Sequence, residues 1–571
     1  MRVRISYIFL LYIIAILTAC SSPKDTHDEE TDNMNNNTSL TADREAMKDT
    51  AADSMETSED KTEKLPEHSI ANPIIWADVP DPDVIRVGDY YYMVSTTMHM
   101  TPGAPIMRSA DMADWELVSY AYDVLEDDNI HNLINGNVYG RGSWAASIRY
   151  HEGFFYVCFG ALETGKTYIF KTEDVENGIW ERMELPSYCH DPSLFFDDGR
   201  VYIINGGGHI WIRELKKDLS GFKTGGVDQE LVNAVIEGKS SGPEGSHMYK
   251  IGDYYYLFLI DWPGVETQRR EWCFRSKTLF GEYEGKIVLD DNFGYGNSGV
   301  AQGGIFDTPE GNWYGIVFQD HGAVGRIPML VPVNWEEDWP MMGVDGRVPE
   351  TLDIKLKGVR HNIIASDEFD YAEDRLSLPW QFNHNPDNSL WSVTKRPGYL
   401  RLITGSVVSD ILTARNTVTQ RTMGPVFITD TKLETTGMKP GDYTGIAAFQ
   451  YDYGMLGVTV SEDGTKAIIL VTNDGEGKPL EQVSLPLEQD TVYLKIEYMF
   501  SLGSGRKISD LNKAYFKYSY DGEEWEKFDY ALPMTYKLEH FVGYRSALFC
   551  YSTEEAGGYA DFDYYHCKTL D

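Results

Sequence analysis

Short apolar runs separated by tight turns set the pattern of the chain from Asn72 to about Trp339. The first, PDPDVIRVGDYYYMVS (residues 80–95), reads as a strand, a Gly-Asp turn and an aromatic return strand. Four later stretches repeat this unit: WAASIRYHEGFFYV, DPSLFFDDGRVYII, EGSHMYKIGDYYYL and AQGGIFDTPEGNWYGIV. Their turn glycines lie 46 to 65 residues apart. Repeats of this length, with three or four strands each, predict a five-bladed β-propeller, because a sandwich would not explain the self-similarity.

The pattern changes after about Arg347. Stretches such as YLRLITG, GIAAFQYDY, KAIILVTND and VYLKIEYMF alternate with Gly, Asp and Asn turns and show no 50-residue repeat. This spacing favours a β-sandwich. The predicted fold is therefore all-β, with a five-bladed β-propeller over residues 71–346 followed by a C-terminal β-sandwich over residues 347–571.

The N-terminus carries a predicted export signal. Arg2 and Arg4 precede an apolar run that ends in Leu-Thr-Ala-Cys at Cys20. A basic segment, a short apolar segment and small residues before a cleavage point are typical of a secretory signal peptide. The ending resembles the lipobox of bacterial lipoproteins, which implies that residues 1–20 are a signal peptide and that Cys20 is lipidated.

Residues 21–70 are rich in Asp, Glu, Asn, Thr and Ser and nearly lack aliphatic residues. Such a composition cannot form a core, so we expect a disordered acidic tether. The protein is then exported and lipid-anchored, in the periplasm or at the outer membrane or cell surface of a bacterium. It would meet a membrane only through this anchor.

Composition limits the partners. The formal net charge of −39 excludes nucleic acid, whose phosphates would be repelled, and is compatible with a neutral glycan. Solubility alone also explains this charge. Of the cysteines beyond Cys20, Cys550 and Cys567 could pair if strand ends bring them together, and the others are expected to be buried and free.

In a propeller the innermost strand of every blade begins beside the central axis. The strand heads therefore converge on one place, and they bring Asp81, Trp144, Asp191, Glu244 and Gln302. Pro82 is expected to hold Asp81 in an extended conformation. A single Asp-Pro is usually a turn residue. Three carboxylates at equivalent positions of three repeats point instead to acid–base chemistry.

The segments PDPDVIRVGDYYYM, HDPSLFFDDGRVY and GPEGSHMYKIGDYYYL resemble glycoside hydrolase family 43, the five-bladed β-xylosidases and α-L-arabinofuranosidases. The resemblance covers residues from about 72 to 345, and the remainder is similar to the concanavalin-like accessory sandwich of many members. It implies inverting hydrolysis, with Asp81 as general base and Glu244 as general acid. Asp191 would tune the acid and position the substrate.

Inversion places the two carboxyl groups roughly 6.5–9.5 Å apart, so that the base can activate a water between them. Glu244 must be protonated near neutral pH, and an ionised Asp191 is expected to raise the pKa of Glu244 by like-charge repulsion. Asp81 must be ionised to take a proton from water.

Other residues are candidates for substrate binding. Arg326 and His321 lie in FQDHGAVGRIP, where the family often places a basic residue that binds sugar hydroxyls; a structural salt bridge is the alternative for Arg326. Trp144 is either a sugar platform or a core residue. At Gln302 the chain departs from the many members that have a histidine associated with a central metal or water cluster. Phe541, in HFVGYRSALF, either reaches across from the sandwich to close one side of the pocket or is a core residue.

No cofactor is expected to be required. Asp367 and Asp563 lie in acidic stretches at either end of the sandwich and could bind a structural calcium through oxygen ligands. Acidic loops that face water are the alternative.

These observations predict an exo-acting glycosidase that releases terminal β-D-xylose or α-L-arabinofuranose from plant hemicellulose or arabinan oligosaccharides. An endo-arabinanase is the alternative among enzymes, and the large second domain counts against it. A non-catalytic glycan-binding surface lipoprotein is the alternative from another class, although a binding protein has no need of three acids. A polysaccharide lyase is disfavoured, because it would need basic residues for acidic sugars and this chain is strongly acidic.

Overall fold

The structure is a computed structural model that describes residues 69–235, 242–262, 268–296, 298–358, 360–473, 478–501 and 512–570. Within these ranges the helices are two 3-10 turns, Gly322–Val324 and Ile411–Thr413, and everything else that is regular is strand. No helix in the described ranges is long and apolar enough to cross a membrane. The predicted signal peptide, Cys20 and nearly all of the tether lie outside the described residues.

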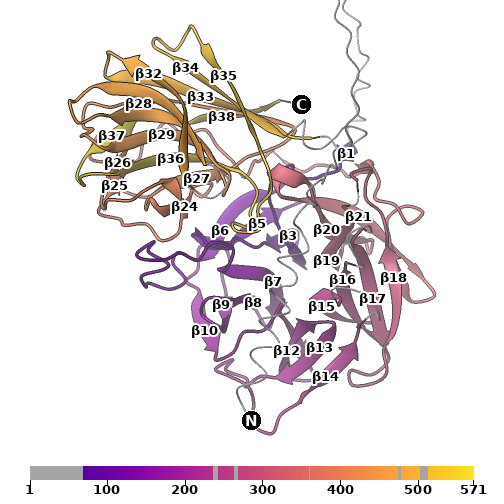
Figure 1. The fold of residues 1–571 in the computed structure, drawn as a ribbon. Coiled ribbons are helices and arrows are strands. Elements are labelled where there is room, and N and C mark those ends of the chain that lie inside the picture. Colours follow the sequence, from indigo (N-terminus) through magenta and orange to yellow (C-terminus); the bar gives the residue numbers. More distant parts are fainter. Residues whose placement is uncertain are drawn as a thin grey trace, which may run out of the picture. The chain divides into compact units, whose positions relative to one another are not determined.

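Five four-stranded antiparallel sheets follow one another along the chain and confirm the five-bladed propeller (Figure 1). Blade 1 is β2 (Asp83–Val87), β3 (Tyr90–Val94), β5 (Gly103–Ser109) and β6 (Glu116–Tyr122). Blade 2 is β7 (Ser143–His151), β8 (Phe154–Ala161), β9 (Lys166–Thr172) and β10 (Glu181–Leu185). Blade 3 is β11 (Ser193–Asp197), β12 (Arg200–Gly207), β13 (His209–Glu214) and β14 (Asp228–Asn233).

Blade 4 is β15 (Glu244–Ile251), β16 (Tyr254–Asp261), β17 (Arg270–Ser276) and β18 (Glu284–Leu289). Blade 5 is β19 (Val300–Asp307), β20 (Trp313–Asp320), β21 (Arg326–Glu336) and β22 (Trp339–Met342). The first strand of each blade is the inner one, and the inner strands contact one another in the order β2, β7, β11, β15, β19 and back to β2. The ring therefore closes by packing of blade 5 against blade 1.

The predicted turn glycines lie where the first hairpin of each blade reverses. Gly88, Gly153, Gly199, Gly252 and Gly311 all have φ between +58° and +86°. This left-handed region costs glycine little, which explains why each repeat carries one there.

A buried ion pair joins the inner strands of three blades. The carboxylate of Asp83 accepts hydrogen bonds from the Ile148 backbone and the Arg149 guanidinium and lies 3.1 Å from Nδ1 of His247. Burial alone would raise the pKa of Asp83, but Arg149 and His247 outweigh it and lower the pKa to about 2. Blades 1, 2 and 4 are thereby tied together by charge at the centre of the ring.

The C-terminal half is a sandwich of two sheets, which confirms the second part of the predicted fold. The first sheet runs β32 (Pro479–Leu487), β31 (Lys466–Asn473), β30 (Gly454–Val460), β29 (Asp442–Phe449), β36 (Arg545–Ser552), β27 (Val418–Arg421), β24 (Gln381–Asn383) and β4 (Met100–Thr101). The second runs β25 (Trp391–Ser392), β26 (Leu400–Ile403), β37 (Tyr559–Phe562), β28 (Val426–Glu434), β33 (Thr491–Met499), β34 (Lys513–Ser519) and β35 (Glu526–Pro533), with β38 (His566–Leu570) paired to β28. Buried and part-exposed residues alternate along β28, as expected of a strand with one face on the core.

The propeller and the sandwich share backbone pairing. β4 lies between the second and third strands of blade 1, yet it forms the edge of the first sandwich sheet by pairing with β24. β1 (Ser69–Ala71) likewise pairs with β23 (Thr351–Asp353), which follows the last blade. Two segments of the propeller half of the chain are therefore hydrogen-bonded to the chain beyond it.

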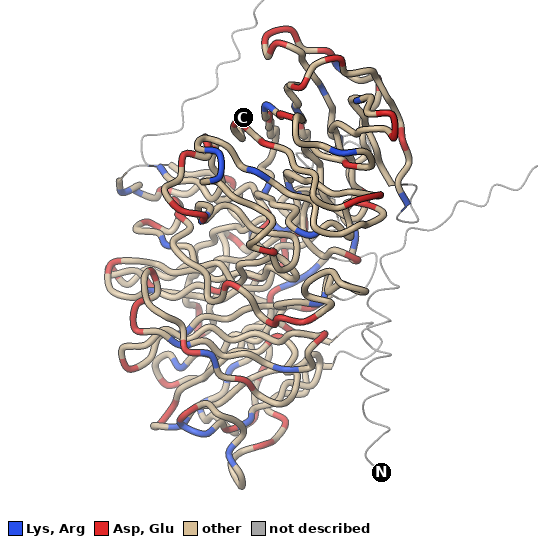
Figure 2. Tube along the Cα trace, turned by 90° about the vertical axis from the view of Figure 1, so that its left-hand side faces the viewer, with Lys and Arg blue, Asp and Glu red and all other residues tan. Residues whose placement is uncertain are grey.

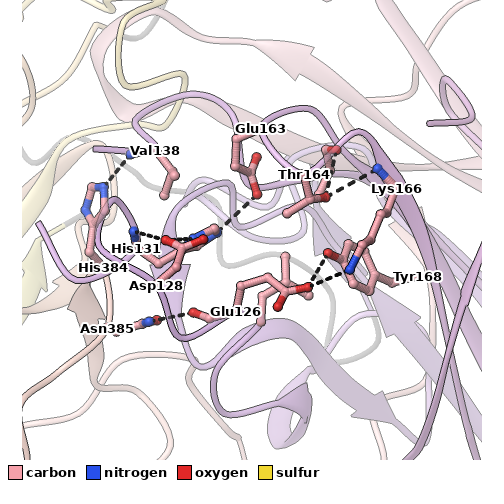
Figure 3. A network of polar contacts seen from close by, with 12 residues as sticks. Glu126, Asp128, His131, Val138, Glu163, Thr164, Lys166, Tyr168, His384 and Asn385 are labelled. Atoms are coloured by element: carbon pink, nitrogen blue, oxygen red, sulfur yellow. Dashed lines mark hydrogen bonds and ion pairs between the residues drawn. The ribbon is translucent and has the colours of Figure 1, made fainter. Parts of the chain in front are cut away.

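The loop between β6 and β7 adds polar contacts between the propeller and the sandwich (Figure 3). The Val138 backbone N–H donates to Nε2 of His384 over 2.9 Å, and Nδ2 of Asn385 donates to the Glu126 carbonyl over 2.7 Å. His131, in the same loop, lies between Asp128 (2.9 Å) and Glu163 (3.2 Å). The loop is thus fixed at both the blade and the sandwich.

Acidic and basic residues are interspersed along the described chain (Figure 2). Some of them form ion pairs between strands, such as Arg86 with Asp307 and Arg401 with Asp561. This mixed surface matches the simple solubility interpretation of the net charge.

One expectation for the sandwich needs correction. Cys550 and Cys567 do not pair, and both are free thiols. Asp367 accepts hydrogen bonds from the Phe369 backbone, Trp380 and Tyr371, and Asp563 binds Lys432 at 2.7 Å. Calcium binding at these two carboxylates stays a prediction.

Candidate active site

The inner strands of all five blades begin with the same backbone distortion. The residues with positive φ are Asp81 (+50°), Ala145 (+29°), Asp191 (+44°), Gly245 (+74°) and Gln302 (+61°). These same residues line a small cavity on the propeller axis. The expectation that Asp81 is extended was wrong, because the close approach of the strand heads outweighs the local preference of a residue before proline.

Asp81 lies buried in the lining of this cavity, and each of its carboxylate oxygens has a protein partner. Oδ1 lies 2.7 Å from Nη1 of Arg326, and Oδ2 accepts a hydrogen bond from the Thr96 hydroxyl over 2.7 Å. Arg326 and Thr96 thereby fix the position of the Asp81 carboxyl group.

Glu244 and Asp191 lie beside one another, with His190 between them. Nε2 of His190 is 2.8 Å from Oε2 of Glu244, and Nδ1 is 3.7 Å from Oδ1 of Asp191. Donor atoms of the three side chains lie within 4.8 Å of one another, which is close enough for a divalent ion. In this structure the histidine and the glutamate bind each other directly, and we assign no metal to the group.

The pKa directions in this group differ from the sequence-based expectation. Burial raises the pKa of Asp191 to about 7 against the opposing charge of His190, and the charges of Glu244 and Asp81 add to the rise. Burial also acts to raise the pKa of Glu244, but the hydrogen bond and charge of His190 and the charge of Arg269 lower it overall. The neighbouring histidine, which the expectation omitted, accounts for the reversal.

An aromatic wall rises beside the acids and comes from both halves of the molecule. Trp144 on β7 stacks on Phe541 with ring centroids 5.2 Å apart. Phe541 lies in the loop before β36, and its ring is 4.5 Å from the guanidinium carbon of Arg326. Phe541 therefore reaches from the sandwich to Trp144 and Arg326 of the propeller, and it is partly buried against the apolar cluster that the two halves share.

Sequence reasoning missed two residues that contact the site, Asp320 and His190. Asp320, at the end of β20, forms ion pairs with two arginines. Its Oδ1 lies 3.2 Å from Nε of Arg326, and its Oδ2 lies 3.0 Å from Nη2 of Arg269. Asp320 directly precedes His321 in the motif that drew attention to the fifth blade. His190 was equally within reach, because it is the first residue of the HDPSLFFDDGRVY motif.

The structure separates two other candidates. Gln302 lies in the lining of the cavity on the propeller axis, where its backbone N–H donates to Glu271 over 2.6 Å. His321 is buried elsewhere: Nδ1 is 3.1 Å from Gln319, Nε2 is 2.8 Å from the Ser501 carbonyl, and the ring stacks on Tyr295. With both ring nitrogens bonded to protein, His321 has no donor or acceptor left for a sugar, and we place it in the joint with the sandwich.

The fold and this site define a class of protein. A five-bladed propeller with three carboxylates and an arginine on its axis, closed on one side by a sandwich, is the architecture of a propeller glycoside hydrolase.

Sequence comparison gives the particular family. Residues 70–340 match the glycosyl hydrolases family 43 profile, and residues 366–568 match the profile of the beta xylosidase C-terminal concanavalin A-like domain. A beta-xylosidase of Formosa agariphila is 30% identical over 550 residues, which are 86% of this chain and 89% of that protein. The chain belongs to glycoside hydrolase family 43 and is a glycosidase.

Other relatives differ in what their names state. A non-reducing end alpha-L-arabinofuranosidase of Bacteroides ovatus is 32% identical over 363 residues, covering 59% of this chain and 65% of that protein. A solved structure of a bifunctional GH43-CE protein of Bacteroides eggerthii is 45% identical, with a TM-score of 0.82 over 88% of this chain. The chain spans 64% of that bifunctional protein's length.

Proposed function

We propose that this protein is an inverting, exo-acting glycosidase that releases terminal β-D-xylose, α-L-arabinofuranose or both from plant cell-wall oligosaccharides. The observation that carries the proposal is the meeting of Asp81, Asp191 and Glu244 around one propeller axis, beside Arg326. The names of the family relatives, a beta-xylosidase and an alpha-L-arabinofuranosidase, support the two sugars.

In this proposal Asp81 is the general base. Arg326 and Thr96 hold its carboxylate in place, and this carboxylate takes a proton from a water that attacks the anomeric carbon. Glu244 gives a proton to the leaving oxygen from the opposite face, as inversion requires. Asp191 lies next to Glu244, and its charge raises the pKa of His190, the histidine that binds Glu244.

The exo mode rests on the wall made by Phe541 and Trp144. A phenylalanine supplied by the sandwich closes the mouth on the side of Trp144, so that the site accepts the end of a sugar chain. The aromatic faces would stack on the C–H face of the terminal sugar.

Hydrolysis of p-nitrophenyl β-D-xylopyranoside and p-nitrophenyl α-L-arabinofuranoside tests the activity, with Asp81→Ala and Glu244→Ala as comparison variants. We expect the wild type to cleave at least one of the two and Asp81→Ala to be inactive. The proton NMR spectrum of the first product should show the anomer opposite to that of the substrate. Retained configuration would exclude the inverting mechanism, and inactivity on both pentosides and on arabinan would favour the binding protein.

We also propose that the chain is exported and anchored through Cys20, which lies outside the described residues. The support is the basic, apolar and small-residue order of residues 1–20. Labelled palmitate should enter the wild-type protein in a bacterial host and should not enter Cys20→Ala. Labelling of the variant would refute this assignment.

A further inference from the structure

A short chain of polar groups leads from the wall of blade 3 to the proposed general acid. The Tyr188 hydroxyl oxygen is 3.0 Å from Nδ1 of His190, and Nε2 of His190 is 2.8 Å from Oε2 of Glu244. We assign the hydrogen of Nδ1 to a bond with the Tyr188 oxygen, which leaves Nε2 as the nitrogen that shares a proton with Glu244. Among the described residues, this is the hydrogen bond that the Glu244 carboxylate makes.

The packing around the pair is tight. Gly207 at the end of β12 faces it, and a Cβ there would lie 3.6 Å from both Oε2 of Glu244 and Cδ2 of His190. The imidazole is largely buried, with 17% of its side chain exposed, whereas 34% of the Glu244 side chain is exposed. The histidine is therefore the inner member of the pair, and the glutamate is the member that can meet a substrate.

Charged groups face the pair from several sides. Burial lowers the pKa of His190, but Asp191 and the hydrogen bond with Glu244 outweigh it and raise this pKa well above its usual value. The positive charges of Arg269 and Arg326 lower the pKa of Glu244, because they favour its carboxylate form. An acid catalyst that is ionised in the free enzyme needs a nearby source for the proton that it donates.

We propose that His190 and Glu244 hold that proton jointly, so that the general acid is a histidine–glutamate pair with Glu244 as the catalytic residue and His190 as its positioning residue. This inference rests on the proposed function. As the glycosidic C–O bond breaks, its electron pair goes to the leaving oxygen, which takes a proton from the Glu244 carboxyl. The Nε2 proton of His190 supplies that carboxyl, and a neutral imidazole beside a carboxylate remains. A solvent proton reloads the pair, while the proton that Asp81 takes from water returns to solvent.

The pair explains how the acid stays loaded at neutral pH. Two coupled sites release their protons in steps that belong to the pair, so one shared proton persists to a higher pH than on Glu244 alone. Acid assistance matters most for a poor leaving group, such as a sugar hydroxyl, and least for an acidic phenol.

His190→Gln is the deciding variant, because glutamine keeps an N–H donor but cannot carry the proton. His209→Gln is the matched control, since His209 is exposed on β13 and contacts Glu230 instead. We expect the basic limb of the kcat/KM profile on a pentose disaccharide to move down by about one pH unit or more in His190→Gln. At pH 7 the disaccharide rate should fall about 10²-fold, and the nitrophenyl pentoside rate should fall much less.

An unmoved basic limb in His190→Gln, or an equal loss on both substrates, would overturn the pair and leave a structural role for His190. NMR titration of labelled histidine provides a second readout that needs no substrate. His190 should titrate well above pH 6.5 in the wild type and lower in Glu244→Gln. A wild-type His190 that titrates at or below 6.5 would refute the pair, whereas a wild type that cleaves no pentoside but shows the raised titration would refute only the proposed function.

Discussion

Arg326 binds groups from three parts of the site at once. Its Nη1 lies 2.7 Å from Asp81, its Nε lies 3.2 Å from Asp320, and its guanidinium carbon lies 4.5 Å from the Phe541 ring. The structure shows the salt bridge that the sequence offered as one alternative, and substrate binding by Arg326 stays a prediction. A planar guanidinium can serve several partners in fixed directions, which an ammonium cannot.

Arg326→Lys tests this geometry. We expect kcat/KM to fall about 10²-fold, because a single ammonium cannot hold Asp81 and Asp320 in their present positions. Arg86→Lys is the matched control, since Arg86 pairs with Asp307 between blades 1 and 5 away from the site. Steady-state kinetics on a pentoside measure the effect, and equal activity of the two variants would refute the role of Arg326.

At the scale of elements, the loop between β6 and β7 joins blade 1 to the sandwich in addition to the pairing of β4 with β24. His131 in this loop is buried between Asp128 and Glu163. Burial lowers the pKa of His131, but the hydrogen bonds with Glu163 and Asp128 outweigh it and raise this pKa above the usual value of 6.5. A folded-state pKa above the unfolded one adds stability below about pH 6.5, and this contribution is lost as pH rises through the folded pKa.

His131→Gln should therefore lower the free energy of unfolding on the order of 1 kcal/mol at pH 6 and by less at pH 9. Thermal unfolding of the variant and of the His209→Gln control at both pH values measures the difference. A loss that is the same at both pH values, or larger at pH 9, would contradict a charged His131 in the folded protein.

At the scale of the whole molecule, the propeller and the sandwich form a shared interface. Asp78 is buried between them, accepting hydrogen bonds from the Arg326 backbone at Oδ1 and from the Gly543 backbone at Oδ2, both over 2.8 Å. Met98 and Met100 of the propeller half pack in one cluster with Phe449 and Tyr453 of the sandwich. Without the sandwich, these apolar side chains and the buried carboxylate would face water or remain unpaired.

A chain without residues 347–571 should consequently be insoluble or unfolded and inactive. A chain without residues 1–66 is the control, which we expect to be soluble and fully active. Circular dichroism, sedimentation and pentoside hydrolysis report the outcome. A soluble, active propeller would show that the sandwich is dispensable for both folding and the proposed site.

Sequence periodicity was sufficient to predict the five blades, the sandwich and the convergence of Asp81, Asp191 and Glu244. These follow from local rules, because turn glycines and alternating apolar runs encode hairpins, and five similar hairpin units in succession are typical of a propeller. The left-handed conformation of Asp81 could not be predicted, since a residue before a proline favours an extended conformation in isolation. His321 was misplaced for a similar reason: its sequence position adjoins the site, but its ring turns toward Ser501.

The sequence by itself determined the architecture and the types of acid available, because hydrogen bonding along the backbone and apolar alternation are read from neighbouring residues. Only the tertiary structure decided which groups meet those acids. The pairing of His190 with Glu244 spans 54 residues, and that of Arg326 with Asp81 spans 245. The charge on a carboxylate depends on burial and on partners within a few ångströms, and these are set when distant strands pack.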